Sequence, residues 1–220
     1  MDANRLTLSD NGFPLAVAVR RIHPSRHTHV GICYREGGRL WLLHMAEDRK
    51  LEHEPFDHSY ACAVPEIPRF RLPFFVRLCR SLRERRPILR YALRHPENAR
   101  FLIKGTGDVG DVVLTKGGAG LNCSTFVLVF FQSYGWPLVN LADWQVRAED
   151  AAWHEVLVNW VGRTDETQAD LIRSEIGCAR VRPEETAGAC LEQIPPPAGF
   201  EQCVANGQHI LQVLDLRPVS

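Results

Sequence analysis

Several features that would place this chain in a special class of protein are missing from its sequence. The longest uncharged apolar stretch, residues 126–131, is far shorter than the roughly 18 residues that cross a bilayer, so no transmembrane segment is expected. The first five residues lack the basic-then-apolar order of a signal peptide, which predicts synthesis in the cytoplasm. The seven cysteines include no C-x-x-C pair, which argues against a zinc ribbon or a thioredoxin-type redox site.

Net charge is also missing. The 26 basic and 26 acidic side chains cancel at pH 7, which argues against a nucleic-acid-binding protein. The cancellation hides a separation of charge, because residues 66–104 hold ten arginines and one lysine against three glutamates, whereas residues 141–188 are acidic. Two interpretations stay open: these segments are solvated or face each other, or the arginine-rich segment binds an anionic partner.

The chain is long enough to form one domain with a full core. It has 220 residues, 45% of them hydrophobic, and no internal repeat or low-complexity linker divides it. We expect a single domain over residues 1–220 with an arginine-rich helical insertion at residues 66–104. Helical and strand periodicities are interspersed, which predicts an α+β fold. Helices are expected over residues 70–95, 122–134, 151–161 and 165–176, and strands over residues 15–19, 109–114 and 209–216.

A β-hairpin is the clearest local structure and is predicted over residues 29–45. Two apolar runs flank the turn signal of Gly37 and Gly38. If these glycines form a two-residue turn, His29 and His44 become diagonal neighbours on one face of the hairpin. Side chains at such positions are within reach of each other, so the two imidazoles are predicted to form a hydrogen bond.

Cys123 lies at the predicted start of an apolar helix, after the glycine-rich residues 117–120. Asn122 belongs to a residue type that caps helix N-termini. The free amides and the dipole there favour a thiolate, so the pKa of the Cys123 thiol is expected to be lowered. A thiol nucleophile needs a base, usually histidine, and a third group that orients the base, and the hairpin supplies two histidines. The alternative is that Cys123 is a small buried hydrophobic residue and that the histidines are structural.

A metal site is the competing use of this region. His27 and His29 form an H-x-H pair, and further candidate ligands follow in the sequence: Glu47, Asp48, Glu52 and His53. Such a pair is common by chance, and a closed site needs more ligands. We therefore expect neither a metal nor a cofactor.

Two segments resemble known motifs. The segment around Cys123 and the one after its helix resemble the cysteine box of NlpC-type papain-like peptidases: Asn122-Cys123-Ser124-Thr125-Phe126-Val127 and Tyr134-Gly135-Trp136-Pro137-Leu138. The hairpin resembles the histidine motif of the same superfamily: His29-Val30-Gly31-Ile32 and Leu42-Leu43-His44-Met45-Ala46. Because the histidines precede the cysteine, the order resembles the circularly permuted branch, which includes lecithin:retinol acyltransferase-like proteins and bacterial amidases or peptidases.

This resemblance implies a papain-like, circularly permuted α+β fold in which a small antiparallel sheet packs on the cysteine-bearing helix. It implies Cys123 as the nucleophile, His29 as the general base and His44 as the third member of the site. Substrate contacts are expected from the two neighbours of the nucleophile and from a glycine-rich loop: Asn122, Ser124 and Asp108.

The expected function is that of a thiol hydrolase, an amidase or peptidase that forms a cysteine acyl-enzyme, most plausibly on peptides of the bacterial cell wall. Ser124 and Thr125 replace the Glu-His of the acyltransferases, and Asn122 and Thr125 replace the Asp and Gly of the peptidases, so the substrate stays open. The alternatives are an acyltransferase or lipid acyl hydrolase and a non-catalytic binding protein on the same fold. A cell-wall substrate is compatible with export of the protein by a dedicated secretion system, as an effector.

Overall fold

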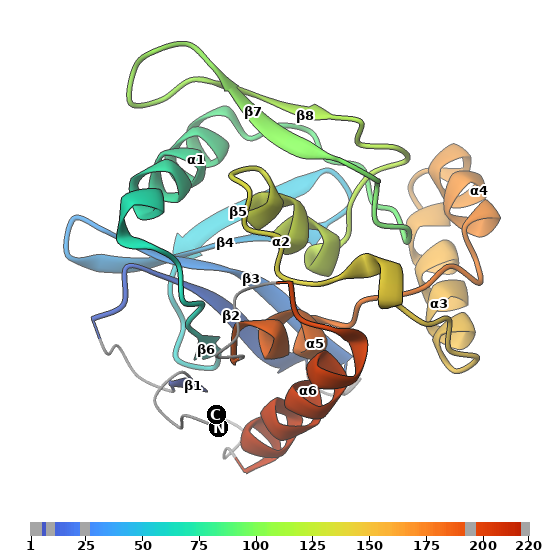
Figure 1. Cartoon of the computed structure of the whole chain (residues 1–220). Coiled ribbons are helices and arrows are strands. Elements are labelled where there is room, and N and C mark those ends of the chain that lie inside the picture. The colour runs from blue at the N-terminus through green and yellow to red at the C-terminus, as the bar shows by residue number, and fades with distance from the viewer. Residues whose placement is uncertain (1–5, 8–11, 23–26, 192–196, 217–220) are drawn as a thin grey trace.

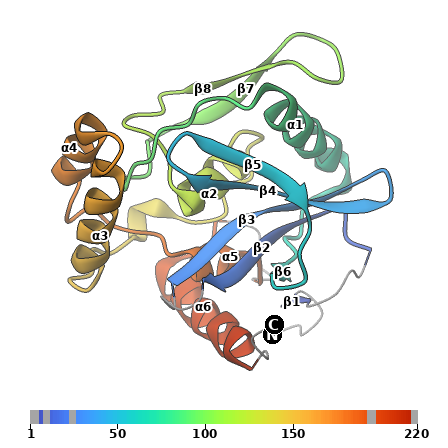
Figure 2. The same ribbon diagram turned by 180° about the vertical axis from the view of Figure 1, so that it is seen from behind.

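The computed structural model describes residues 6–7, 12–22, 27–191 and 197–216. It has an α+β fold, as predicted, in which helices pack around an antiparallel sheet (Figures 1 and 2). Within the described residues this sheet has six strands, and all its pairings are antiparallel. In sheet order the strands are β1 (Leu6–Thr7), β6 (Ala61–Ala63), β2 (Leu15–Ile22), β3 (His27–Glu36), β4 (Arg39–Glu47) and β5 (Lys50–Pro55).

The hairpin of β3 and β4 forms with the predicted turn and register. Gly37 and Gly38 have φ angles of 57° and 76°, the left-handed conformation that a two-residue hairpin turn of type I′ requires at both positions. Glu36 is therefore paired with Arg39. Since side chains alternate between the two faces of a strand, this register decides which side chains of β3 meet those of β4.

Helix α2 (Cys123–Gln132) forms the centre of the core, and every residue from Cys123 to Phe131 is buried. It contacts β3 and β4 of the main sheet and β7 (Arg100–Lys104) of a second sheet, which β7 forms with β8 (Asp111–Thr115). Figure 1 shows α2 between the two sheets, with the main sheet on one side and β7 and β8 on the other. None of the helices that the structure describes is long and apolar enough to cross a membrane.

The arginine-rich segment, residues 66–104, is helical only in part. Its helix α1 (Leu72–Arg85) has Pro73 in the first turn and is followed by Arg86 with a φ of 42°. Pro87 disfavours a helical conformation for the residue before it, so the helix ends there. The helix predicted for this segment is therefore too long, and the segment ends in strand β7 instead.

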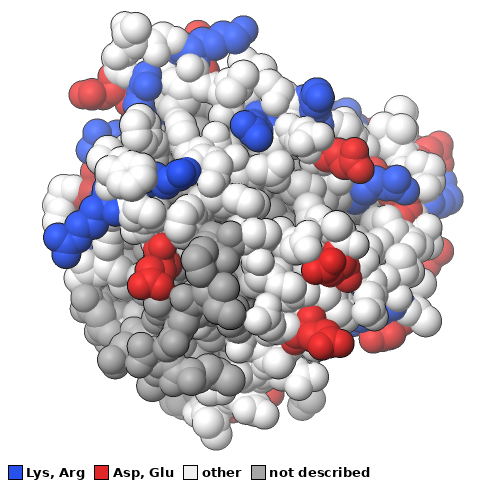
Figure 3. All heavy atoms as spheres, viewed as in Figure 1, with Lys and Arg blue, Asp and Glu red and all other residues white. Residues whose placement is uncertain are grey.

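Several arginines of this segment hold the fold together. Arg80 and Arg83 of α1 bind Glu36 of the hairpin, and Arg90 pairs with Asp165 at 2.7 Å. Because Asp165 belongs to the acidic segment, the two charged segments face each other at this point. Other Lys and Arg side chains stay on the surface, and Figure 3 shows such side chains over α1 and the β7–β8 hairpin. The exposed basic residues of the segment include Arg69, Arg85, Arg86, Arg100 and Lys104.

After α2, the described part of the chain consists of helices and loops, with one isolated β-bridge between Val139 and Ala198. The helices of this part are α3 (Asp150–Gly162), α4 (Glu166–Ser174), α5 (Pro183–Gly188) and α6 (Phe200–Asp215). Short 3₁₀ helices occur at Leu141–Asp143 and Ala189–Leu191, and another precedes α1 at Arg69–Arg71. The strand predicted over residues 209–216 is wrong, because α6 continues to Asp215. The helical spacing of buried residues becomes clear only over 12 residues of α6, whereas the strand was predicted from the eight residues 209–216. These buried residues are Cys203, Asn206, Gly207, Ile210 and Leu214.

A buried carboxylate connects these helices to the centre of the molecule. Asp150 begins α3, is 2% exposed and pairs with Arg147, Arg180 and Arg182. Burial alone would raise the pKa of Asp150, but the arginines outweigh it, so the pKa lies below its usual value. The guanidinium of Arg180 also lies 3.5 Å from the ring centre of Trp153. These contacts fix Arg180 close to the N-terminus of α2.

Replacing Asp150 with asparagine would leave three arginines around a neutral side chain. We expect the free energy of unfolding to fall by about 3–5 kcal/mol, the range found when one partner of a buried ion pair is removed. Because the folded-state pKa is lowered, the contribution of Asp150 is complete above the unfolded pKa of about 3.9 and is lost as the pH falls through the folded value. Urea unfolding followed by circular dichroism measures the change. Asp170→Asn, which removes an exposed pair with Arg173, is the control and should cost at most about 1 kcal/mol; equal losses in both variants would contradict the expectation.

Candidate functional site

Asn122 places Cys123 in the first turn of α2. The Asn122 side chain accepts a hydrogen bond from the Thr125 backbone N–H, and the Thr125 hydroxyl accepts one from the Asn122 N–H, so each caps the other. The Asn122 amide also donates to the carbonyl oxygens of Ala92 and Leu93. The predicted cap is confirmed, and it joins the helix start to the loop before β7.

The Cys123 side chain is 7% exposed, and its surroundings have opposing effects on the pKa of the thiol. Burial raises the pKa of the thiol above its usual value, and three groups offset this only in part: the Val30 backbone N–H, the charge of Arg180 and the amide and hydroxyl of Ser124. The expectation of a lowered pKa is therefore wrong, because the loss of hydration outweighs the N-terminal amides. Cys123 is a neutral thiol at pH 7 and needs a base before it can act as a nucleophile.

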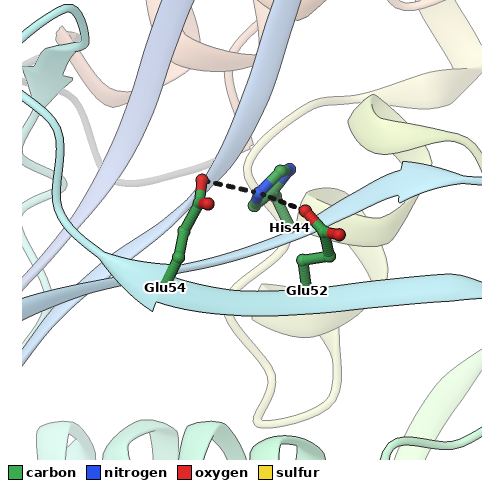
Figure 4. A group of neighbouring side chains, drawn as sticks. All are labelled: His44, Glu52 and Glu54. Atoms are coloured by element: carbon green, nitrogen blue, oxygen red, sulfur yellow. Dashed lines mark hydrogen bonds and ion pairs between the residues drawn. The ribbon is translucent and has the colours of Figure 1, made fainter.

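The two histidines form the predicted hydrogen bond. His29 Nε2 and His44 Nδ1 are 2.8 Å apart, and the side chains are 8% and 4% exposed. On its other side His44 Nε2 lies 3.2 Å from a carboxylate oxygen of Glu54, a residue of β5 (Figure 4). Gly31 makes room for this packing, because a Cβ atom at that position would lie only 2.7 Å from the Cβ of His44.

The Glu54 carboxylate determines which ring nitrogens of His44 and His29 carry a proton. An ionised Glu54 only accepts hydrogen bonds, so His44 must donate through Nε2. A neutral His44 then accepts at Nδ1, and His29 must donate to it through Nε2. The remaining nitrogen of His29, Nδ1, carries a free electron pair. The arrangement thus prepares one nitrogen of His29 to accept a proton.

Both imidazoles are neutral at pH 7. Burial lowers the pKa of His29 to about 3, with smaller contributions from His44 and Arg20. Burial also lowers the pKa of His44, although Glu54 and Glu52 act against it. His29 is therefore in the protonation state that a general base requires across the neutral and mildly acidic range.

Cys123 and His29 line one pocket with a volume of about 480 Å³. The two side chains do not form a hydrogen bond with each other in this structure, and the thiol lies instead at the backbone N–H of the residue after His29. Most of the remaining lining is apolar: Ile22, Met45, Trp153, Val156, Leu157 and Trp160. The pocket therefore brings a thiol and a neutral imidazole to a largely apolar cavity.

Three further residues of the site were missed by sequence reasoning. Glu54 accepts from His44, Arg180 favours the thiolate form of Cys123, and the Tyr91 hydroxyl lies at the Cys123 backbone N–H. Pairing of residues 50–55 as a third strand beside the hairpin would have pointed to Glu54. In that strand Glu52 is paired with His44, and Glu54, two positions later, lies on the same face. Tyr91 and Arg180 lie in irregular segments, where no periodicity indicates a neighbour.

The structure places the three predicted substrate contacts outside the lining of this pocket. Asn122 and Ser124 are 4% and 1% exposed and do not line the pocket, because the first caps α2 and the second faces the thiol. Asp108 is exposed in the turn between β7 and β8 and does not line the pocket either. A substrate in this pocket would instead contact the aromatic and apolar side chains of α3.

A second carboxylate faces the histidine pair. Glu52 Oε2 lies 3.9 Å from His44 Nε2, and Figure 4 shows Glu52 and Glu54 on either side of the His44 ring. Among the described residues, these three are the ones whose ligand atoms lie within 4.8 Å of one another and could hold a metal ion. The H-x-H pair of His27 and His29 forms no such group with other residues in the part of the chain that the structure describes.

Because burial raises the pKa of Cys123, we expect its alkylation by iodoacetamide to be slow at pH 7. The rate should keep rising with pH to beyond about 8.5, the usual pKa of a free thiol, because only the thiolate reacts. Mass spectrometry of the peptide that carries Cys123 measures the rate, and the peptide with the half-buried Cys178 provides an internal comparison. A rate that already reaches its plateau below pH 7 would mean that the thiolate is stable in the free protein.

Comparisons of the chain with protein-family models, with curated proteins and with solved structures found no match.

Proposed function

We propose that this protein is a cysteine-dependent hydrolase, an amidase or peptidase with a circularly permuted papain-like fold. One observation carries the proposal: the Cys123 thiol, at a helix N-terminus, opens into the same pocket as His29, whose free nitrogen is set by the chain of His44 and Glu54. A nucleophile, a base and groups that orient the base are the parts that acyl transfer through a thiol requires. The packing of α2 on an antiparallel sheet is compatible with the resemblance to papain-like enzymes.

In the proposed reaction, His29 Nδ1 accepts the thiol proton as the sulfur of Cys123 attacks the carbonyl carbon of the substrate. Negative charge develops on the carbonyl oxygen, toward which the Tyr91 hydroxyl, itself held by the Cys123 backbone N–H, can donate a hydrogen bond. The C–N bond then breaks, the amine leaves with the proton from His29, and an acyl-thioester remains on the sulfur. Water that gives a proton to His29 hydrolyses the thioester and restores the thiol.

The separation of Cys123 and His29 in the free protein fits this scheme. Catalytic hydrogen bonds are often long without substrate and shorten in the complex. The Val30 N–H and Arg180 favour the thiolate once it forms, which lowers the energy of the charged state without producing it at rest. His44 and Glu54 act as positioning residues, since they act on the substrate only through His29.

Peptides of the bacterial cell wall are the proposed substrate, following the resemblance of the cysteine and histidine segments to NlpC-type peptidases. Such a substrate is compatible with export by a dedicated secretion system. The exposed arginines over α1 then offer a contact to anionic groups of the cell wall.

The test is incubation with purified peptidoglycan and mass spectrometry of the products. Wild type should release peptides with new amino or carboxyl termini. Cys123→Ala should lower the rate at least about 10³-fold and His29→Gln about 10²–10⁴-fold. His44→Ala should lower kcat at least about tenfold with little change in KM, because it changes the base and not the pocket. His58→Gln, which changes an exposed histidine, is the control; undiminished turnover in Cys123→Ala would refute the nucleophile.

A lipid acyl hydrolase or acyltransferase is the second candidate, favoured by the apolar lining of the pocket. Trp153 and Trp160 of α3 contribute to this lining, and Ile22 and Val156 are 41% and 53% exposed. An acyl chain would fit against these side chains without any polar partner.

Esters of increasing acyl-chain length separate the two candidates. If the pocket binds an acyl chain, kcat/KM should rise with length by up to about fourfold per methylene, since each buried methylene contributes about 0.8 kcal/mol. Trp160→Ala should weaken this dependence, and Trp136→Ala, a tryptophan that does not line the pocket, should preserve it. A rate that does not depend on chain length, together with cleavage of peptidoglycan, favours the amidase.

A further inference from the structure

His44, Glu52 and Glu54 together offer a set of ligand atoms that is typical of a metal site. His44 offers Nε2, and the two glutamates of β5 offer carboxylate oxygens at 3.2 and 3.9 Å from it. Figure 4 shows the two carboxylates on either side of the ring. A nitrogen and two carboxylates are a donor set that Zn²⁺ accepts in sites with three protein ligands and one open position.

The distances fit a small ion. Zinc bonds of about 2.0–2.2 Å in a tetrahedral arrangement place neighbouring ligand atoms about 3.3–3.6 Å apart. The oxygen of Glu54, at 3.2 Å from His44 Nε2, lies just below this range and that of Glu52, at 3.9 Å, just above it, so each needs to move by only a few tenths of an ångström. Glu52 is free to do so, because its side chain is 34% exposed and its other partner, Lys50, is 52% exposed.

His44 also has the support that a metal-binding histidine needs, independently of the carboxylates. The ring is 4% exposed, and its second nitrogen, Nδ1, is 2.8 Å from His29 Nε2. Metal-ligating histidines commonly use the second nitrogen to donate a hydrogen bond to a fixed acceptor, which holds the ring in place. A neutral His29 can serve as that acceptor.

We propose that His44, Glu52 and Glu54 bind a divalent transition-metal ion such as Zn²⁺, and that binding of this ion blocks the base. The inhibition part of this proposal rests on the proposed function, whereas the binding part does not.

The inhibition follows from the positions of the protons. A metal ion takes the electron pair of His44 Nε2, so the proton of His44 must reside on Nδ1 and be donated to His29 Nε2. A neutral His29 then carries its own proton on Nδ1, the nitrogen that the proposed reaction uses to accept the thiol proton. The two rings hold two protons before and after, but both protons change places. His29 in this form has no free electron pair for the thiol proton.

Metal binding is tested with the Cys123→Ala protein, which removes the thiol as a competing ligand. Isothermal titration calorimetry with ZnCl₂, and visible absorption with Co²⁺ as a spectroscopic probe, should each report one bound ion. Glu52→Gln in the same background should weaken binding at least tenfold, and Glu54→Gln is a second variant with the same expectation. Glu201→Gln, which changes an exposed carboxylate of α6, is the control. Unchanged affinity in both site variants would overturn the metal site.

Inhibition is tested with the active wild type. ZnCl₂ should lower turnover, and a chelator should restore it. For each protein, inhibition is measured relative to its own rate without zinc. Glu52→Gln should need at least tenfold more zinc than wild type to lose the same fraction of that rate. Equal sensitivity of wild type and Glu52→Gln would overturn the inhibitory role, because zinc would then act at another place such as Cys123. If wild type shows no turnover on any substrate, the proposed hydrolase fails, while calorimetry still decides the metal site.

Discussion

The hydrogen bond between His29 and His44 is the interaction on which the rest of the site depends. It exists because the turn of Gly37 and Gly38 sets the register of β3 and β4, and because Gly31 leaves room for the second ring. It transmits the influence of the Glu54 carboxylate to the far nitrogen of His29. The same hydrogen bond would transmit the influence of a metal ion, with the opposite result for the protons. In the proposed scheme, a single contact therefore prepares the base and also offers a way to block it.

Burial has opposite consequences for the thiol and for the imidazoles, and together they define the resting state. Loss of hydration raises the pKa of Cys123 and lowers the pKa values of His29 and His44, so all three are neutral at pH 7. A preformed thiolate–imidazolium pair is therefore not the resting state. The proposed reaction transfers a proton only when a substrate enters, and the nearby Arg180 then favours the charged sulfur.

Local signals in the sequence predicted the parts of the site that short segments form by themselves. The turn, the hairpin register and the Asn122 cap each depend on neighbours within a few residues, and each is found in the structure. Predictions failed where a longer segment or a distant partner decides. Residues 209–216 resemble a strand, yet the helical spacing over the whole of α6 determines their conformation. The lowered pKa expected for Cys123 failed because burial depends on what packs over the helix end.

The sequence alone determined the chemical types and their local frames: a cysteine at a capped helix start, and two histidines on one face of a hairpin. These follow from capping preferences and from the period of a strand, which act over short distances. The tertiary structure alone decided that Glu54, Tyr91 and Arg180 join them, and that the thiol is buried and neutral. Those residues come from separate strands and loops, and only the packing of the chain brings them within a few ångströms of one another.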